Sequence, residues 1–477
     1  MAKQQKLKPF GIADKLGYMF GDFGNDFTFI LSTMILTKFY TDVMVVDAAV
    51  VGFIMMLSRF VDAVTDVTMG RICDAAKPTA AGKFKPWLLR MCIPVAFSSF
   101  VMYAPGFISA SASEWSDGVK IAYLGISYIL WGSFCYTGIN IPYGSMVSAI
   151  SSDPNDCAGL STFRTLGGTL AGVVIGMSVP MLAYDSVVNE KGEQLSILNG
   201  TKVAWIALGC SVLAVVCYLL AYKMITERVK YKTTKKQEKT SIVKMLKNAA
   251  KNRALISIIV ASILMLLAQL TMQNMGSYIY PDYYGRNVGQ VLSTVAMTVS
   301  MIIAAVVAKP LAAKFGKAEV SIVSCFFATG VCVLTWLIRP QQMWLFIVLQ
   351  SLNWLGLGMF SMVCWALITD VIDYSEIKNG VREDGSVYAL YSFARKLGQA
   401  VAAGLSGWLL SAIGYNGEAA KLKIPQTDAV KEGMFDITTL VPAIGFLLLA
   451  LVLWFWYPLH KKQVDANVET LKAKHSK

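Results

Sequence analysis

Twelve apolar segments, each long enough to cross a lipid bilayer as a helix, dominate this sequence. A membrane-spanning helix needs about 20 mainly apolar residues. Of the 477 residues, 55% are hydrophobic and only 15% are charged, whereas soluble domains carry about 25% charged residues. We therefore expect an all-α integral membrane protein whose transmembrane helices span residues 17–40, 47–74, 86–107, 119–150, 157–184, 202–224, 254–280, 289–313, 318–338, 342–374, 386–413 and 435–458.

Basic residues gather in alternate loops of this predicted topology. Segment 225–253 contains ten Lys or Arg residues and only two acids, and both termini are basic. Because cytoplasmic loops carry an excess of Lys and Arg, we expect both termini to be cytoplasmic and the protein to lie in the plasma (inner) membrane. The net charge of +13 then reflects loops beside the lipid bilayer, and we expect no nucleic-acid partner.

The predicted spans contain no histidine, no cluster of metal ligands typical of an enzyme and no nucleophile–base pair. The two histidines, His460 and His475, lie in the C-terminal tail, and none of the nine cysteines forms a Cys-x-x-Cys pair. A proton relay inside the membrane would therefore use carboxylates instead of imidazole. We expect neither an enzyme nor a bound cofactor, apart from a coupling ion.

Short motifs recur at a nearly constant spacing, which indicates two related halves. The pattern Arg-x-Leu-Gly begins at Arg164 and again, 231 residues later, at Arg395. The dipeptide Gly-Lys that begins at Gly82 recurs at Gly316. Such repeats place a substrate site near the midplane between two halves. We expect two pseudo-symmetric six-helix bundles, at residues 1–224 and 254–458, joined by a basic cytoplasmic linker at 225–253. A cytoplasmic tail follows at residues 459–477.

The second predicted span carries Arg59, Asp62 and Asp66, which helical spacing places on one face. Ionisable groups are expensive inside a bilayer, so each is a functional candidate. Two carboxylates one turn apart repel each other unless a cation such as Na⁺ binds beside them or one of them binds a proton. Either arrangement makes a coupling-cation site. The alternative is a structural pair in which Arg59 neutralises one of the two acids.

Polar and aromatic residues in the first and fourth spans suit a sugar ligand. In the first span Asp22 and Asp26 lie one turn apart, and Asp26, deeper in the apolar run, is the candidate acceptor for sugar hydroxyls. The alternative is that one of these acids pairs with a cation such as Arg164. The fourth span adds rings that can stack on a sugar and polar groups that can meet its hydroxyls, at Tyr136, Thr137, Asn140 and Tyr143.

Spans ten and eleven contribute less specific candidates. Trp365 can stack on a sugar, although tryptophans in membrane spans more often pack or anchor at the interface. Arg395 and Lys396 are adjacent, so at most one of them faces an internal cavity. Lys396 is either a partner of the span-two acids, taking part in coupling, or a lysine that extends to the membrane interface.

Several stretches together resemble the glycoside–pentoside–hexuronide:cation symporters of the major facilitator superfamily. The run from Arg59 to Gly70 and the loop from Gly82 to Trp87 are specific when they occur together. The run from Asp370 to Glu376 is similar to the family's tenth-span exit, and Lys396 falls on its span-eleven lysine. The resemblance covers nearly the whole chain, and it implies a monomer with two six-helix bundles and a central sugar site that opens alternately to each side.

The resemblance also implies roles for individual residues. Asp62 and Asp66 match the family's cation-binding aspartates, and Thr137 matches its hydroxyl ligand. Thr65 stands where other members have an asparagine, which leaves the choice between Na⁺ and H⁺ open. Arg59, Lys396 and Asp22 are then the residues expected to take part in coupling.

The sugar-binding positions of the family are only partly matched. Asp26 and Arg164 fall on positions in and around the family's sugar site. The family's melibiose permeases have an aspartate and a tryptophan where this chain has Asn140 and Gly144. The fourth span is more similar to branches that carry xylosides, glucuronides or other glycosides, so melibiose itself is not the expected substrate.

We expect a cation-coupled (Na⁺ or H⁺) secondary symporter for a glycoside or oligosaccharide, such as a xyloside, glucuronide or galactoside, working by alternating access. Two other functions are compatible with parts of the sequence. A Na⁺-coupled lysolipid carrier would share the span-two acids but needs an apolar tunnel. A sensor that binds sugar without transporting it would need a signalling domain, and only 19 residues follow Pro458.

Overall fold

The computed structural model describes residues 9–188, 192, 194–229, 252–379 and 384–475. These residues are mainly α-helical and fall into two compact units. Unit 1 comprises Met1–Lys235 and Tyr415–Gln426, and unit 2 comprises Lys236–Gly414 and Thr427–Lys477. Most basic residues of the expected linker 225–253 lie outside the described residues, and only Arg228 and Arg253 among them are described.

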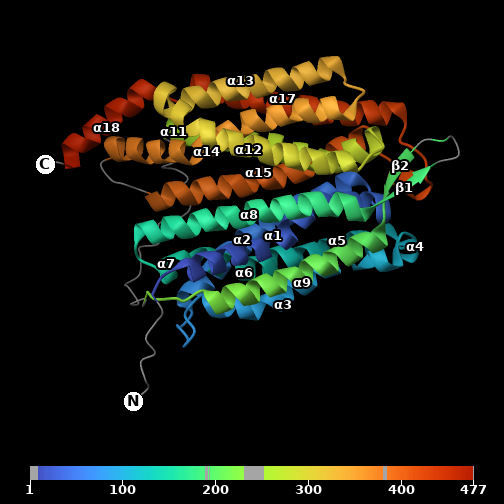
Figure 1. The fold of residues 1–477 in the computed structure, drawn as a ribbon, viewed down its shortest axis with the longest axis horizontal. Helices are drawn as coiled ribbons and strands as arrows, with labels where there is room; N and C mark the ends of the chain where they lie inside the picture. The colour runs from blue at the N-terminus through green and yellow to red at the C-terminus, as the bar shows by residue number, and fades with distance from the viewer. Residues whose placement is uncertain (1–8, 189–191, 193, 230–251, 380–383, 476–477) are drawn as a thin grey trace. The chain divides into compact units, whose positions relative to one another are not determined.

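Unit 1 is built from long helices and a few short ones, coloured blue to green in Figure 1 except for α16, which has the orange-red of the C-terminal part. A π-helical segment, Leu130–Tyr136, joins α5 to α6 without a break, and a second, Phe39–Val43, continues α1. A 3₁₀ segment, Ala104–Ile108, precedes α4. The helices are α1 (Ile12–Lys38), α2 (Ala48–Ala75), α3 (Lys85–Val101), α4 (Ser109–Ala112), α5 (Asp117–Ile129), α6 (Thr137–Ser145), α7 (Val147–Ile150), α8 (Pro154–Ala183), α9 (Gly200–Met224) and α16 (Glu418–Lys421).

Unit 2 has the same kind of architecture, coloured yellow to red in Figure 1. Its α11 also ends in a π-helical segment, Ile279–Tyr283, and another, Val452–Trp456, follows α17. The helices are α11 (Arg253–Tyr278), α12 (Val288–Phe315), α13 (Lys317–Ile338), α14 (Met343–Asn379), α15 (Asp384–Ala412), α17 (Asp428–Leu451) and α18 (Lys461–His475).

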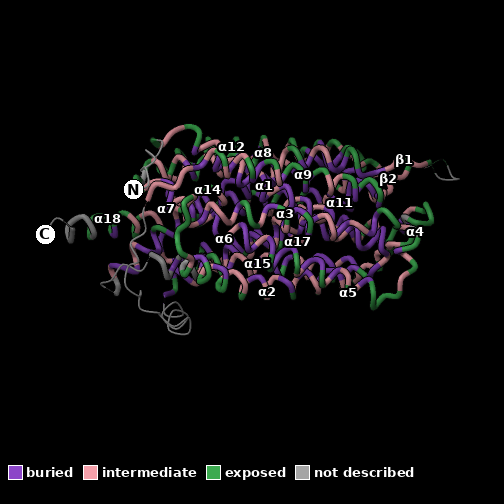
Figure 2. The backbone as a smooth tube through the Cα atoms, turned by 90° about the horizontal axis from the view of Figure 1, so that it is seen from below, coloured by how far each residue is buried: buried purple, intermediate pink, exposed green. Residues whose placement is uncertain are grey.

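Every one of the twelve expected spans is helical. Ten helical stretches in the described part of the chain are long and apolar enough to cross a membrane. The other two, α1 and α15, have similar lengths but carry ionisable residues in mid-helix, such as Asp22 and Arg395. Buried and exposed positions alternate along the same helices (Figure 2), and the exposed ones include large apolar side chains such as Val306 and Ile126. This pattern is expected of helices that face protein on one side and lipid on the other.

The two units repeat the same packing of helices. In unit 1, α1 packs against α8 and α9, and α3 packs against α9 and α6. In unit 2, α11 packs against α15 and α17, and α13 packs against α17 and α14. The repeated motifs at Arg164 and Arg395 therefore lie on helices, α8 and α15, that occupy equivalent places in their units.

Two tyrosines fix the fourth span against the first. The rings of Tyr18 on α1 and Tyr143 on α6 stack with centroids 4.5 Å apart. Tyr143 Oη donates to the backbone oxygen of Tyr18 at 2.6 Å. Gly21 makes this approach possible, because any Cβ at this position would collide with the ring of Tyr143. This contact fixes the position of α6 along α1, and with it the relative positions of the polar residues that follow on both helices.

The structure contains two features that the sequence analysis did not predict. The segment after α8 forms an antiparallel hairpin of β1 (Tyr184–Val188) and β2 (Gln194–Leu198). The segment Tyr415–Gln426, which follows α15 of unit 2, belongs to unit 1. It is anchored at a buried ion pair, in which Lys38 Nζ lies 2.8 Å from Asp42 Oδ2. Tyr415 Oη accepts from Lys38 Nζ at 3.0 Å and donates to Asp42 Oδ1 at 2.9 Å.

Candidate functional site

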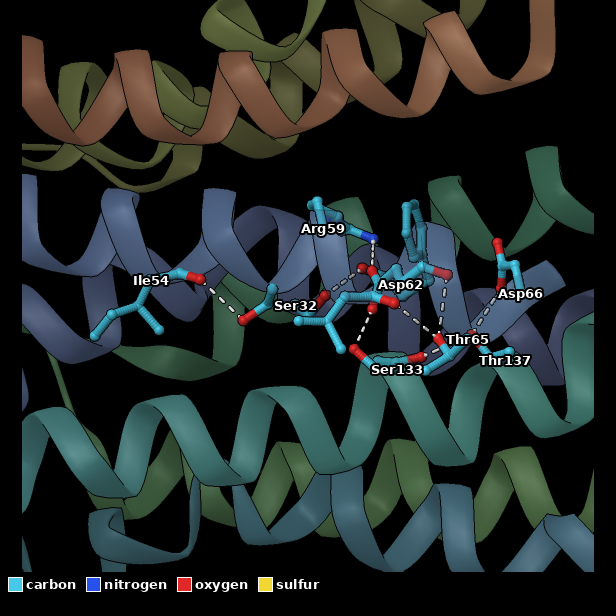
Figure 3. A network of polar contacts seen from close by, with 12 residues as sticks. Ser32, Ile54, Arg59, Asp62, Thr65, Asp66, Ser133 and Thr137 are labelled. Carbon is cyan, nitrogen blue, oxygen red and sulfur yellow. Dashed lines mark hydrogen bonds and ion pairs between the residues drawn. The ribbon is translucent and has the colours of Figure 1, made fainter. Parts of the chain in front are cut away.

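The three ionisable residues of α2 lie in one polar network (Figure 3). Arg59 Nη1 lies 3.3 Å from Asp62 Oδ2, so the expected neutralisation of one acid by arginine is present. Ser133 Oγ donates to the other oxygen of Asp62 at 2.5 Å, and Thr137 Oγ1 donates to Asp66 Oδ1 at 2.8 Å. Each carboxylate of α2 is therefore met by one hydroxyl group from the fourth span.

The register of the two neighbouring spans produces this pairing. Asp62 and Asp66 are one turn apart on α2, and Ser133 and Thr137 are likewise four residues apart on the chain that faces it. Ser133 lies in the π-helical segment Leu130–Tyr136, and such segments are often found at functional sites because they re-aim side chains. The network brings two carboxylates, one of them paired with an arginine, beside two hydroxyl groups, and such a set of oxygen atoms can bind one monovalent cation or one proton.

Arg59 is held from several sides. Its guanidinium group lies 5.4 Å from the ring centroid of Phe29 and 5.9 Å from that of Tyr128. Aromatic faces stabilise a guanidinium group that has left water. Arg59 is therefore a resident positive charge of the network, which compensates Asp62 in the absence of any other cation.

The hydroxyl group of Thr65 is not directed at the acids. Thr65 Oγ1 donates to the backbone oxygens of Val61 and Asp62, at 3.2 Å and 3.1 Å. Its hydrogen is thus used within α2, and only the lone pairs of this oxygen remain available to a cation. The predicted role of Thr65 as a cation ligand stays a prediction.

A second ionic cluster joins α1 and α8. Arg164 Nε donates to Asp22 Oδ1 at 2.9 Å, and the Arg164 guanidinium group lies 5.4 Å from the ring centroid of Tyr143. Asp26 Oδ2 and Asp22 Oδ2 both lie beside Gly168 of α8, where a Cβ would come within 2.7 Å of the first oxygen and 3.1 Å of the second. The structure therefore brings Asp22, Asp26 and Arg164 together.

Two polar groups on α1 and α6 have no partner in the described part of the chain. Neither the Asp26 carboxylate nor the Asn140 amide makes a hydrogen bond or ion pair with a described residue, and both side chains are half-buried. Tyr136, one turn before Asn140, stacks on Phe29 with ring centroids 5.7 Å apart. An acceptor, an amide and a ring are thus present on the first and fourth spans.

The remaining predicted site residues belong to unit 2. Trp365 on α14 packs edge-to-face on Tyr391 of α15, with ring centroids 5.2 Å apart, and 47% of its surface is exposed. Lys396 is half-buried on α15. Its predicted pairing with the acids of α2 stays a prediction.

Sequence reasoning missed Ser133 and the aromatic residues around Arg59. A serine inside an apolar run is a weak signal because its hydroxyl group usually donates to its own helix, as Ser127 does to the backbone oxygen of Leu124. The spacing of four residues between Ser133 and Thr137, equal to that between the two acids of α2, could have indicated it.

Comparison with known proteins gives consistent results. Residues 17–461 match the family described as MFS/sugar transport protein. The chain is 29% identical over 450 residues to the glucuronide carrier protein homolog of Escherichia coli (strain K12), covering 94% of this chain and 93% of that protein. It is 27% identical over 468 residues to a putative sulfoquinovose importer of the same organism, covering 98% of this chain and 95% of that protein.

A comparison of structures leads to the same fold. The crystal structure of a D-xylose-proton symporter matches with a TM-score of 0.62 at 14% identity, covering 94% of this chain and 98% of that chain. At this level of identity the match shows the fold alone.

Proposed function

Since this chain belongs to the MFS/sugar transport proteins, as a member of the glycoside–pentoside–hexuronide:cation symporters, we propose that it carries a glycoside together with a monovalent cation. The proposed location is the plasma (inner) membrane, with both termini cytoplasmic and the chain working as a monomer. The chain acts as a transporter and not as an enzyme.

The observation that carries the cation part of this proposal is the set of oxygen atoms in the network on α2. Two carboxylates one turn apart, Asp62 and Asp66, lie beside the hydroxyl groups of Ser133 and Thr137. Neighbouring carboxylates in a membrane helix repel each other, so binding of Na⁺ or H⁺ stabilises the network. Oxygen atoms are the ligands that hard cations prefer.

The substrate part rests on the second cluster. Asp26 and Asn140 can hydrogen-bond to sugar hydroxyls, and the ring of Tyr136 can stack on the apolar face of a pyranose. Arg164 holds Asp22 in place and leaves Asp26 to the ligand. The names of two similar proteins, the glucuronide carrier protein homolog and the putative sulfoquinovose importer, support a sugar as the class of substrate.

The two clusters are connected through adjacent residues of the fourth span, which supports coupling between binding of the cation and binding of the sugar. Tyr136 and Thr137 are adjacent residues of the fourth span, one assigned to the sugar and the other to the cation. Binding of the cation at Thr137 therefore fixes the segment that carries the sugar-binding ring. A membrane potential of 100 mV contributes about 2.3 kcal/mol for one charge moved inward, which supports roughly fifty-fold accumulation.

A flux experiment tests the function. Purified protein is reconstituted into vesicles, Na⁺ and H⁺ gradients are imposed separately, and uptake of labelled xylosides, glucuronides, galactosides and a lysolipid is measured. We expect concentrative uptake of a glycoside under one of the two gradients. Gradient-driven uptake of the lysolipid alone, or no driven uptake at all, would refute the proposal.

Ser133 gives a prediction about the cation. The Ser133→Ala change removes an oxygen beside the cation and leaves Asp62 without its hydroxyl donor. Because a hydrogen bond to a charged group contributes about 1.5–3 kcal/mol, we expect the half-saturating concentration of the coupling cation to rise about tenfold or more. The matched control is Ser127→Ala, which removes a buried hydroxyl group from the same span that donates to the backbone oxygen of Leu124 and not to an acid of α2. Equal effects of the two changes would argue against a role for Ser133.

A further inference from the structure

The start of α3 and the end of α9 lie beside each other at one end of unit 1. The two helices pack side by side and run in opposite directions (Figure 1). Lys85 Nζ, in the first turn of α3, lies 4.7 Å from the ring centroid of Tyr222, in the last turn of α9. At the other end of the pair, Phe107 and Trp205 are in edge-to-face contact, with ring centroids 5.1 Å apart. The end that carries Lys85 is the one that we expect on the cytoplasmic side.

Both helices expose an apolar stripe that leads to this end. On α3, Leu89, Ile93 and Phe97 follow one another at intervals of four residues and are 47%, 68% and 62% exposed. On α9, Val216 and Leu219 are exposed as well. On a membrane helix, an exposed apolar stripe of this kind faces the acyl chains of the lipids.

A basic side chain stands at the end of each stripe. Arg90 follows Leu89 on α3, and Lys223 follows Leu219 by one turn on α9; both side chains are exposed. The Arg90 guanidinium group lies 5.5 Å from the ring centroid of Trp87, one turn nearer the start of α3. Because helical side chains tilt toward the N-terminus of their helix, this contact directs the charge of Arg90 toward the membrane surface.

The protein does not neutralise these charges within the described part of the chain. There, neither Arg90 nor Lys223 forms an ion pair or a hydrogen bond through its side chain. The neighbouring acid, Glu227, is bound by the backbone at the start of α3, since it accepts from the amides of Lys83 and Phe84 at 2.7 Å and 2.9 Å. The basic side chains therefore remain available to an anion from outside the chain.

The equivalent helix of unit 2 has an exposed apolar face without the basic group. The offset of 234 residues that relates the two Gly-Lys dipeptides places Ser321 and Ser324 of α13 at the positions of Trp87 and Arg90. Both serine hydroxyl groups donate to backbone oxygens of α13. Val323, beside Ser324, is 68% exposed. The aromatic–basic pair is therefore an addition of unit 1 that the spanning of a membrane does not require.

We propose that this end of α3 and α9 is a binding site for one anionic phospholipid. Arg90 contacts the phosphate group, Lys85 and Lys223 add to the positive potential around it, and the acyl chains lie along the stripe of Leu89 and Ile93. Each basic residue beside an anionic lipid contributes about fivefold in affinity, so an anionic headgroup is favoured over a zwitterionic one. The apolar stripe favours a lipid over a free phosphate. This inference goes beyond the proposed function and is independent of the sugar that is carried.

Native mass spectrometry of the purified full chain in detergent tests this site. The protein is titrated with phosphatidylglycerol or with phosphatidylcholine of the same acyl chains, and the dissociation constant of the first bound lipid is measured. We expect phosphatidylglycerol to bind about 25- to 100-fold more tightly, because the contributions of two or three basic residues multiply. Glycerol 1-phosphate at the same concentration should not compete, because it has the charge without the acyl chains.

Variants connect the preference to these residues. In the double variant Arg90→Gln with Lys223→Gln, we expect the affinity for phosphatidylglycerol to fall about 25-fold and that for phosphatidylcholine to change less than about twofold. The matched control is Arg71→Gln, which removes an exposed arginine near the end of α2 on the same expected side of the membrane. It should leave the affinity for the first phosphatidylglycerol within about twofold of the wild-type value.

Each of three outcomes would overturn the inference. Equal affinities of the wild-type protein for the two lipids would make the basic residues interface anchors only, and this comparison needs no variant to fold. A fall of the same size in Arg71→Gln would show that the preference comes from the general charge of the protein. Competition by glycerol 1-phosphate would remove the assignment to a lipid. None of these measurements involves the uptake of a sugar, so they leave the symporter proposal untouched.

Discussion

In the Asp66→Asn variant, we expect cation-driven accumulation of the glycoside to fall from roughly fifty-fold to about equal concentrations on both sides of the membrane. The change removes one of the two carboxylates that we propose as ligands of the cation, so the network no longer binds the cation. Thr137 keeps a hydrogen-bonding partner in the asparagine, so the packing of α2 against the fourth span is retained. Sugar exchange without a gradient should therefore persist.

Vesicles loaded with a labelled glycoside measure both quantities, accumulation under a cation gradient and exchange without one. The matched control is Asp185→Asn in the β-hairpin. The hydrogen bonds from Lys202 and Asn199 hold the pKa of Asp185 below its usual range. Its small contribution to stability is therefore present at neutral pH and is lost as the pH falls through that lowered pKa. Asp185→Asn should leave accumulation unchanged, and full accumulation in Asp66→Asn would remove the cation assignment.

The result of the Asp62→Asn change should be harder to interpret than that of Asp66→Asn, because it combines a loss of accumulation with a loss of stability. It also abolishes accumulation, because one charge is removed from the network, but it leaves Arg59 without its carboxylate partner. An unpaired buried charge destabilises the fold by about 3–5 kcal/mol, so the yield of folded protein should fall as well. A loss of accumulation in Asp66→Asn at normal stability is the more informative result.

The largest expected effect on stability is that of Lys38→Met. Lys38 and Asp42 form an ion pair whose side chains are only 1% and 2% exposed. Removing one partner leaves the Asp42 carboxylate buried with only hydroxyl donors, so we expect a loss of about 3–5 kcal/mol in the free energy of unfolding. Thermal unfolding of the purified protein in detergent measures this as a lowered midpoint.

Two further variants control this measurement. Lys202→Met breaks the pair with Asp185, whose side chains are 47% and 40% exposed, and should cost at most about 1 kcal/mol. Lys38→Met combined with Asp42→Asn removes both buried charges and should recover much of the loss, because the amide still meets Tyr415 Oη. Equal midpoints for Lys38→Met and Lys202→Met would contradict the interpretation of Lys38–Asp42 as a strong buried pair.

The membrane fold could be predicted because length and hydropathy are local properties of the sequence. Each apolar run between 17–40 and 435–458 became a helix, and the repeated motifs marked equivalent helices. The hairpin formed by Tyr184–Val188 and Gln194–Leu198 was missed because each strand has only five residues and the segment between the predicted spans carries several acids, which is typical of a loop. The membership of Tyr415–Gln426 in unit 1 depends on contacts between residues more than 370 positions apart, such as Tyr415 and Asp42, which no local pattern encodes.

The candidate site was predictable to a similar degree. Asp62 and Asp66 were candidates because ionisable groups are rare in apolar spans, and helical spacing placed them on one face with Arg59. The family resemblance implied the role of Thr137, which donates to Asp66 in the structure. The contribution of Ser133 depends on the π-helical turn of Leu130–Tyr136, which shifts the register of the fourth span by one residue and carries no clear signature in the sequence.

Among the described residues, the chain leaves unit 2 after Gly414 and re-enters it after Gln426. These two boundaries lie twelve residues apart, so the end of α15 and the start of α17 are joined by a short segment that belongs to unit 1. Gly414, at the first boundary, has a φ of 75°, a backbone conformation that is strained for residues with a side chain. The distance by which these two helix ends can separate is therefore limited by that short segment, and a substitution at Gly414 would strain its first turn.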